Sequence, residues 1–137
     1  MESYKGYEDN IFNMILVLDP NTYNIIHRSH YNGVEEDLYY DDNNNCIQIE
    51  LDSGTIINYE YDENNNCIKM YSNTGYEQFM DYDENGKCIH MRNNNCECDY
   101  EYDNRGNIVL EKYNNGYEVH YKYDDDGNFL GTYDNIT

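Results

Sequence analysis

Carboxylates are the most numerous ionisable groups in this chain that could bind a metal or act as acids and bases. The sequence holds 28 Asp and Glu against 8 Lys and Arg and 4 His. The run DYDENG at residues 81–86 has the acid spacing of a calcium loop. The twelfth position of that loop needs a bidentate glutamate, and Arg92 stands there instead. Turn chemistry alone explains the run, so we expect no calcium site.

Cysteine and histidine form a second candidate, a zinc site. Cys96 and Cys98 are separated by one residue, and Cys88 and His90 precede them. Structural zinc sites commonly place two or more residues between paired ligands so that a turn can wrap the metal. Cys96 and Cys98 instead alternate with acids, which is typical of a strand with one apolar face. We expect core cysteines, no metal and no cofactor.

The spacing of the cysteines argues against disulfides. Cys46, Cys67 and Cys88 recur at intervals of 21 residues. If each repeat is a hairpin, equivalent positions lie two strands apart, at about 9.6 Å, which exceeds the roughly 7 Å Cα limit for a disulfide. The N-terminal residues MESYKGYEDN do not resemble a signal peptide, and the apolar run at residues 11–18 is too short to span a bilayer. These features predict a reduced, cytoplasmic protein.

The sequence carries no arrangement typical of an enzyme. Its histidines are scattered, and the motifs of serine hydrolases, phosphate-binding loops and zinc proteases do not occur. Among 28 acids, some pair with the separation found in glycosidases is expected by chance. We therefore predict no catalytic residues.

The dipeptide Tyr-Asp recurs every 20 or 21 residues and defines an internal repeat. Four residues after each of these tyrosines comes Asn or Gly, and six residues after it comes an apolar residue. Because Asn and Gly tolerate positive φ, each Tyr-Asp predicts a tight turn. The marker tyrosines are Tyr40, Tyr61, Tyr82, Tyr102 and Tyr123. A second turn is predicted seven residues before each marker, at Gly33, Gly54, Gly75, Asn95 and Gly116.

Segments with period-two patterning lie between these turns, and none reads as a helix. In residues 117–123, tyrosines and Val119 share one face, whereas Glu118, His120 and Lys122 share the other. The pattern predicts an all-β fold, an antiparallel meander of stacked β-hairpins in a curved or rolled sheet. We expect a single domain over residues 1–137, with N-terminal strands and a degenerate first repeat over 1–37 and regular repeats over 38–137. In the degenerate unit, Leu18-Asp19 replaces Tyr-Asp and one turn residue is added.

This register resembles the YD repeat, also called the RHS repeat, in which Tyr-Asp precedes two variable residues, Gly, Arg or Asn, and an apolar residue. The runs YDENGKCI, YDNRGNIV and YDDDGNFL match the pattern closely, and YDDNNNCI and YDENNNCI match it less closely. The resemblance covers residues 38–137 well and 11–37 weakly. In that family, long arrays form β-shells that enclose a toxic domain, or stand on cell surfaces and bind carbohydrate or proteins. Six units are too few to enclose a passenger, so the resemblance implies a short, free-standing derivative.

A net charge of −20 repels nucleic acid and anionic membranes and attracts basic surfaces. Carboxylates on a sheet face repeat at about 4.8 Å between strands and about 6.6 to 6.8 Å along one strand, close to the roughly 6 to 7 Å between phosphates of a nucleic-acid strand. We therefore predict a non-enzymatic inhibitor that blocks the basic nucleic-acid-binding surface of a nuclease or defence effector. It would be an immunity protein to a toxin nuclease or a phage-type anti-CRISPR inhibitor. The predicted partner-binding residues point away from the tyrosines and are Glu35, Asp37, Glu60, Glu77, Asp81, Glu97, Asp99, Glu101 and Glu118.

An alternative interpretation gives the carboxylates no role beyond solubility. The protein would then be a YD-repeat carbohydrate- or protein-recognition module, whose exposed tyrosines stack on sugars or on a partner protein. Salt discriminates between the two, because charge pairing weakens as ionic strength rises and aromatic stacking hardly changes. The unpaired edges of the terminal strands also allow a homodimer.

Overall fold

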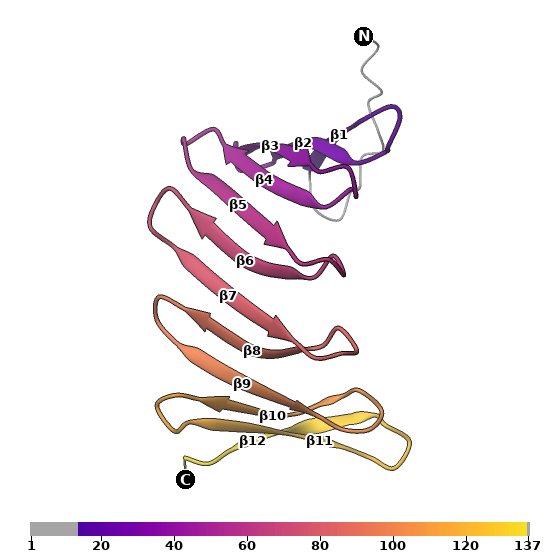
Figure 1. Ribbon diagram of the computed structural model, residues 1–137, viewed down its shortest axis with the longest axis vertical. Coiled ribbons are helices and arrows are strands. Elements are labelled where there is room, and N and C mark those ends of the chain that lie inside the picture. Colours follow the sequence, from indigo (N-terminus) through magenta and orange to yellow (C-terminus); the bar gives the residue numbers. More distant parts are fainter. Residues whose placement is uncertain (1–13, 137) are drawn as a thin grey trace. The chain divides into compact units, whose positions relative to one another are not determined.

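The computed structural model describes residues 14–136, which form twelve β-strands and no helix (Figure 1). Each strand pairs antiparallel with its neighbour in the chain within two compact units, residues 1–76 and 77–137, so the predicted all-β meander is confirmed. These two compact units are called the N-terminal unit and the C-terminal unit. Residues 1–13, which include part of the predicted first repeat, lie outside the described residues. Within the described range there is no helix with the length and apolar content that a membrane span requires.

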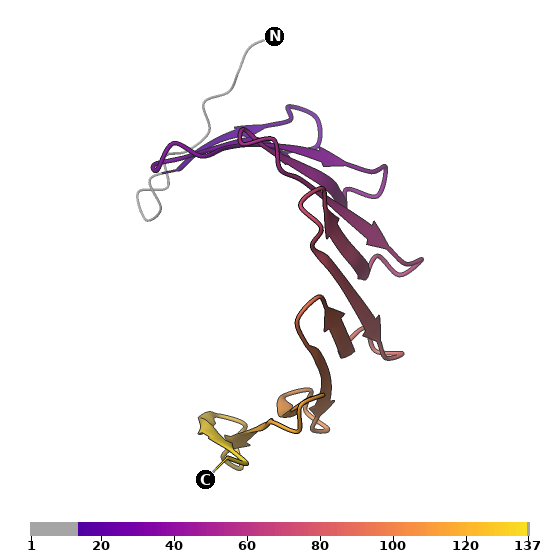
Figure 2. The same ribbon diagram turned by 90° about the vertical axis from the view of Figure 1, so that its left-hand side faces the viewer.

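The N-terminal unit is a six-stranded open sheet in chain order, and the side view shows one layer of strands (Figure 2). Leu38 lies opposite Ile49 across one pair of strands, and Tyr59 lies opposite Met70 across another. The strands are β1 (Met14–Leu18), β2 (Ile25–His30), β3 (Glu35–Tyr40), β4 (Cys46–Leu51), β5 (Ile56–Tyr61) and β6 (Cys67–Ser72).

The C-terminal unit repeats this arrangement with six further strands in chain order. Met91 lies opposite Cys98, and Glu111 lies opposite both Tyr100 and Val119 on its two sides. The strands are β7 (Glu77–Tyr82), β8 (Cys88–Asn93), β9 (Glu97–Tyr102), β10 (Ile108–Tyr113), β11 (Glu118–Tyr123) and β12 (Phe129–Asp134).

Each Tyr-Asp dipeptide begins a turn that its aspartate holds together. Asp62 Oδ1 accepts hydrogen bonds from the backbone N–H groups of Asn64 and Asn66, both at 2.9 Å, and Oδ2 accepts one from the Asn66 side chain at 3.0 Å. Asn65 takes a φ of 63°, as the repeat pattern predicts. The predicted positive φ is confirmed in all five of these turns, at Asn44, Asn65, Gly86, Gly106 and Gly127.

The turns at the opposite edge follow the prediction at four of five positions. Gly33, Gly54, Gly75 and Gly116 have positive φ, but the prediction that Asn95 takes the place of glycine is wrong, because no residue of this turn has a positive φ. The turn is one residue shorter than its equivalents. Asn93 N–H donates directly to the Cys96 carbonyl at 2.9 Å, and Asn93 Oδ1 accepts from the N–H groups of Asn95 and Cys96 at 2.9 and 3.0 Å. The Asn93 side chain therefore closes this turn.

Alternation along the strands gives each unit a tyrosine face and a polar face. Among the described apolar residues only Leu38, at 8% exposure, and Cys98, at 1%, are buried. The core of each unit is therefore one side of a sheet, built largely of half-buried side chains. The tyrosine face includes Leu38, Tyr40, Ile49, Tyr59, Tyr61 and Met70 in the N-terminal unit, and Met80, Met91, Cys98, Tyr100, Tyr102, Val119, Tyr121 and Tyr123 in the C-terminal unit.

Three marker tyrosines use their hydroxyl groups to join successive repeats. Tyr61 donates to the carbonyl of Cys46 at 2.6 Å, and Tyr102 donates to the carbonyl of Cys88 at 2.6 Å. Tyr40 makes the same bond to the carbonyl of Ile25 at 2.7 Å. Phenylalanine could pack on this face but could not make the bond. Burial, the largest effect, raises the pKa of Tyr61 to about 12.

Candidate functional surfaces

The nine carboxylates predicted to bind a partner all lie on the polar face of their own unit. The register aligns Asp37 with His27 and Glu60 with Lys69 in the N-terminal unit, and Asp99 with both His90 and Lys112 in the C-terminal unit. The nine residues divide into Glu35, Asp37 and Glu60 in the N-terminal unit, and Glu77, Asp81, Glu97, Asp99, Glu101 and Glu118 in the C-terminal unit.

A histidine clamps two of these acids in the N-terminal unit. His27 Nδ1 lies 2.7 Å from Asp37 Oδ1, and His27 Nε2 lies 2.7 Å from Glu35 Oε2. Ser29 also donates to Glu35 Oε2 at 2.7 Å. Because both ring nitrogens face carboxylate oxygens, the protonated ring fits best. The hydrogen bond to Asp37, and that to Glu35, raise the pKa of His27 above its usual value.

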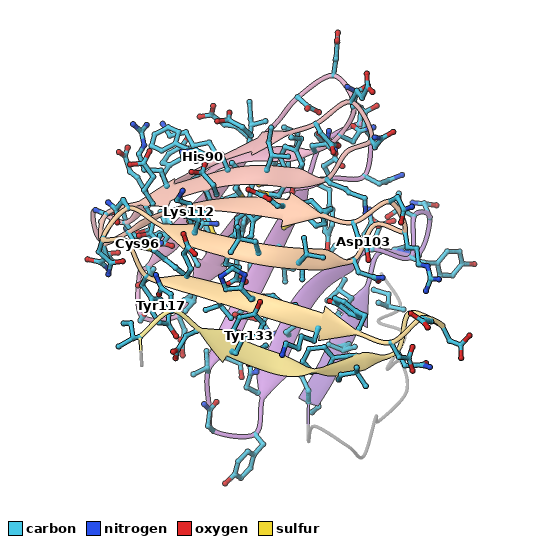
Figure 3. All side chains as sticks on the ribbon, turned by 90° about the horizontal axis from the view of Figure 1, so that it is seen from below. His90, Cys96, Asp103, Lys112, Tyr117 and Tyr133 are labelled. Atoms are coloured by element: carbon cyan, nitrogen blue, oxygen red, sulfur yellow. The ribbon has the colours of Figure 1, made fainter. Side chains whose placement is uncertain are left out.

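The same clamp recurs in the C-terminal unit, three repeats further along the chain. His90 Nδ1 lies 2.6 Å from Asp99 Oδ1, and His90 Nε2 lies 3.1 Å from Glu97 Oε1. The hydrogen bond to Asp99 raises the pKa of His90. Figure 3 shows His90 among the side chains of this unit. Each clamp brings two predicted acids together and offsets part of their negative charge.

Lysine and arginine further reduce the negative charge of the polar face in the C-terminal unit. Lys112 lies across from Asp99 on one side and from Glu118 on the other. Arg92 lies across from Glu97, and its guanidinium carbon is 4.8 Å from the centre of the Phe79 ring. Sequence patterning identified the polar face correctly, but the mixture of charges depends on cross-strand register, which the sequence alone did not supply.

A second acidic surface lies at one edge of each unit, and the sequence prediction did not include it. All Tyr-Asp turns of a unit fall on the same edge of a meander, which we call the Tyr-Asp edge. In the C-terminal unit Asp103 lies at one end of the strands, and Cys96 and Tyr117 lie at the other (Figure 3). The acids of this edge are Asp19, Asp41, Asp42, Asp62 and Glu63 in the N-terminal unit, and Asp83, Glu84, Asp103, Asp124, Asp125 and Asp126 in the C-terminal unit.

Hydrogen bonds within the turn lower the pKa of five turn aspartates, which are Asp19, Asp41, Asp62, Asp103 and Asp124. Hydrogen bonds from the side chain and the backbone of Asn66 hold the pKa of Asp62 below its usual value. At Asp103 the backbone hydrogen bond from Asn107 has the largest lowering effect on the pKa. The recurring Tyr-Asp dipeptide was the signal that could have identified this edge, because it marks every turn with a carboxylate.

Glu36 and Glu111 lie on the tyrosine face instead. Arg28 Nε lies 2.6 Å from Glu36 Oε2, and His30 Nε2 lies 2.9 Å from the same oxygen. In the C-terminal unit, Tyr113 and Tyr121 each donate to Glu111, both at 2.9 Å. Burial, followed by the hydrogen bond to Glu111, raises the pKa of Tyr121 to about 12. These acids have local partners and help to order the tyrosine face.

Each unit has an open groove between successive Tyr-Asp turns. The N-terminal groove, of about 410 Å³, is lined by Asp41, Asn43, Asn45, Ile47, Tyr59, Glu60, Tyr61, Asp62 and Asn65. The C-terminal groove, of about 670 Å³, is lined by Asp103, Asn104, Arg105, Val109, Tyr121, Lys122, Tyr123, Asp124, Asp125 and Leu130. Ile47 and Val109 occupy the same position of the repeat, where a β-bulge adds one residue to the strand.

In the described part of the chain, no group of three or more His, Cys, Asp or Glu side chains is placed so that it could hold a metal ion. Of the cysteines considered for zinc, Cys88 and Cys96 are half-buried. Cys98 is buried on the tyrosine face, and burial, the largest effect, raises the pKa of its thiol. His90 lies on the opposite face with Asp99.

No protein-family model and no curated protein matches the sequence. Among solved structures, the chain is similar to the crystal structures of TcdB2-TccC3 (TM-score 0.66) and TcdB2-TccC3-Cdc42 (TM-score 0.65), each with 15% identity over 94% of this chain and 8% of the other. It is also similar to the Tc holotoxin pore of Photorhabdus luminescens that carries the TccC3-D651A mutation, with a TM-score of 0.59 and 13% identity over 96% of this chain. The chain spans a tenth or less of those chains. At this identity the likeness shows the fold, an antiparallel meander of β-hairpins, and agrees with the resemblance to YD repeats.

Proposed function

We propose that this chain is a short array of YD repeats, or RHS repeats, and that it acts as a non-enzymatic acidic binding protein. Its partner is a basic protein, a nuclease or another nucleic-acid-binding effector, whose nucleic-acid-binding surface it blocks. The observation that supports this most strongly is the regular display of ionised carboxylates along the Tyr-Asp edge of each unit.

The Tyr-Asp edge suits such a role because its carboxylates are already ordered. Asp41 Oδ1 accepts hydrogen bonds from the N–H groups of Asn43 and Asn45 at 2.8 and 2.9 Å, so the side chain loses little freedom when a partner binds. Asp42 follows it directly in the exposed part of the turn. Binding by a row of ordered charges costs less conformational entropy than binding by a flexible acidic tail would.

The polar face contributes a second, weaker set of charges. The His27 and His90 clamps and the cross-strand basic residues offset part of the negative charge of the nine predicted acids. Asp81 and Glu101 lie outside the clamps and are exposed. We therefore assign the larger share of charge attraction to the Tyr-Asp edge. An immunity protein to a toxin nuclease and a phage-type anti-CRISPR inhibitor are the two settings that fit.

A pull-down from host lysate, followed by identification of the retained proteins, tests this function. We expect a basic nucleic-acid-binding protein to be retained at low salt and released at high salt, because surface charge pairs are screened. Retention of only neutral proteins or glycans that survive high salt would contradict the proposal.

Two charge-reversal variants locate the contact. Asp42→Lys with Glu63→Lys changes the Tyr-Asp edge without removing a turn aspartate. Asp81→Lys with Glu101→Lys makes the same change of charge on the polar face and keeps Glu97 and Asp99, the two acids that contact His90 in its clamp. We expect the first variant to lose more of the captured protein than the second. Thermal unfolding of both variants checks that the fold is retained.

The alternative, recognition of sugars or proteins by tyrosines, is favoured by one observation. Tyr23 and Tyr31 are 75% and 81% exposed in the turns of the N-terminal unit. Most tyrosines of the tyrosine face are half-buried instead, and several use their hydroxyl groups within the protein. Replacement of Tyr23 and Tyr31 by serine abolishes binding under this alternative and leaves it unchanged under the acidic-binding proposal.

A further inference from the structure

The two grooves occupy the same position of the repeat but differ in charge. Both lie between a Tyr-Asp turn and the next, and both contain the bulge residue and the marker tyrosine. The C-terminal groove contains Arg105 and Lys122. The equivalent positions of the N-terminal groove hold Asn43 and Glu60, and no Lys or Arg is among its lining residues.

The C-terminal unit shows that a basic side chain fits between successive turns. Arg105 Nη2 donates to the backbone carbonyl of Asp125 in the next turn. Its guanidinium lies over Gly127, where an added Cβ would lie 2.9 Å from Arg105 Nη1. One repeat earlier, Lys87 Nζ donates to the carbonyl of Gly106 at 3.0 Å and lies 5.0 Å from the centre of the Tyr102 ring. The chain therefore places its own cations between successive turns in this unit.

The N-terminal groove offers a basic side chain a similar site without filling it. The Glu60 side chain is exposed and makes no hydrogen bond or ion pair with the described residues. Its cross-strand neighbour Lys69 lies with Nζ 4.6 Å from the centre of the Tyr71 ring. Ile47 is 37% exposed, and Asn45 donates to Asn65 Oδ1 at 2.9 Å beside it. The lining thus combines an apolar surface with the carboxylates of Asp41, Glu60 and Asp62.

We infer that the N-terminal groove binds a lysine or arginine side chain of the basic partner. The aliphatic stem packs on Ile47, and the cation pairs with Glu60, since long basic side chains bury their stems and keep their charge at a polar surface. The inference rests on the proposed function and names the place where the partner is held. The charge complementarity of this groove selects a basic protein as its occupant.

A peptide of lysine and arginine residues, blocked at both ends, serves as the probe. We expect NMR titration to shift the Ile47 methyl and Asn65 side-chain amide signals, and Glu60→Lys to raise the peptide Kd at least about fivefold. The matched control is Asp52→Lys, which makes the same change of charge at the opposite edge of the same unit. Equal weakening by both variants, or no shift at Ile47, would overturn the groove site.

A second test introduces the inferred binding site into the C-terminal groove by substitution. Arg105→Asn with Lys122→Glu gives it the residues that stand at those positions in the N-terminal groove. We expect this double variant to gain a second peptide site, detected as shifts at Val109 and a higher stoichiometry in titration calorimetry. Absence of a second site would contradict the inferred roles of these positions.

The outcomes separate the groove from the proposed function. Peptide binding that shifts only polar-face residues outside the groove would reject the groove and leave the acidic-binding function standing. No binding of the peptide at low salt would reject both. Binding that is insensitive to salt and to Glu60→Lys would reject charge pairing as its basis.

Discussion

The two units share one scaffold and differ in the charges that they display. In both, Tyr-Asp turns are closed by an aspartate, and marker tyrosines bond to the preceding repeat with the same 2.6 Å distance at Tyr61 and Tyr102. The position before the marker tyrosine holds Glu60 in the N-terminal groove and Lys122 in the C-terminal groove. The comparison teaches that some positions of the repeat determine the fold while others are free to vary in charge.

The largest expected effect tests the cores of the two units. Leu38→Ala should lower the free energy of unfolding by about 3 kcal/mol, because it removes most of a buried aliphatic side chain from a thin core. Hydrogen exchange measured by NMR reports the loss strand by strand. If residues 1–137 form the predicted single domain, the protection of backbone amides from exchange falls in both units. A loss of amide protection confined to β1–β6 would contradict the single domain. A loss below about 1 kcal/mol would show that the site is not a core position.

The next effect concerns the bond between repeats. Tyr61→Phe and Tyr102→Phe should each cost about 1 to 2 kcal/mol, because a part-buried carbonyl loses its partner. Urea unfolding of the two variants measures the costs. We expect similar values, since the bonds have the same length. A large loss of free energy of unfolding in only one of the two variants would show that the hydroxyl bonds do not have the same role in the two units.

The histidine clamps predict a pH effect in both units. The pKa values of His27 and His90 are raised, so each clamp stabilises the fold fully below the unfolded pKa of histidine. That stability is lost as pH rises through the raised folded pKa. NMR titration of the ring protons should give both pKa values above about 6.5, the usual value for histidine. His90→Gln should remove the pH dependence in its own unit, and values at or below the usual pKa would contradict the clamps.

The smallest effect is expected at Lys87, because the other regular Tyr-Asp turns hold Asn at this position, including Asn107 and Asn128 in the same unit. Lys87→Asn gives the C-terminal unit the residue that stands at Asn45 and Asn66 in the N-terminal unit. Because the Lys87 side chain makes one hydrogen bond to the Gly106 carbonyl and one contact over the Tyr102 ring, the variant should lower the free energy of unfolding by less than about 1 kcal/mol. A cost above about 1.5 kcal/mol, measured by urea unfolding, would show that the lysine belongs to the scaffold.

Much of the scaffold could be predicted because turn chemistry and strand periodicity are local. Glycine and asparagine at fixed distances from Tyr-Asp placed nine of ten turns correctly, and the exception at Asn95 arose because a shorter loop uses the side chain of Asn93 instead. The same alternation placed the nine predicted acids on the polar face.

The features that the sequence did not reveal depend on contacts between strands. The His27 and His90 clamps require each ring to lie opposite an acid of the next strand, which depends on the bulges and loop lengths. The bonds of Tyr61 and Tyr102 to carbonyls of the preceding repeat likewise need the register. The role of Glu60 became visible only when its groove could be compared with that of Lys122.

Competition with nucleic acid tests the central claim most directly. A single-stranded oligonucleotide is titrated into the complex between this protein and the basic protein that it captures, and the bound fraction of each is measured by fluorescence anisotropy. We predict mutual displacement, because both ligands occupy one basic surface. A ternary complex in which oligonucleotide and protein bind together would contradict the claim that this protein blocks a nucleic-acid-binding surface.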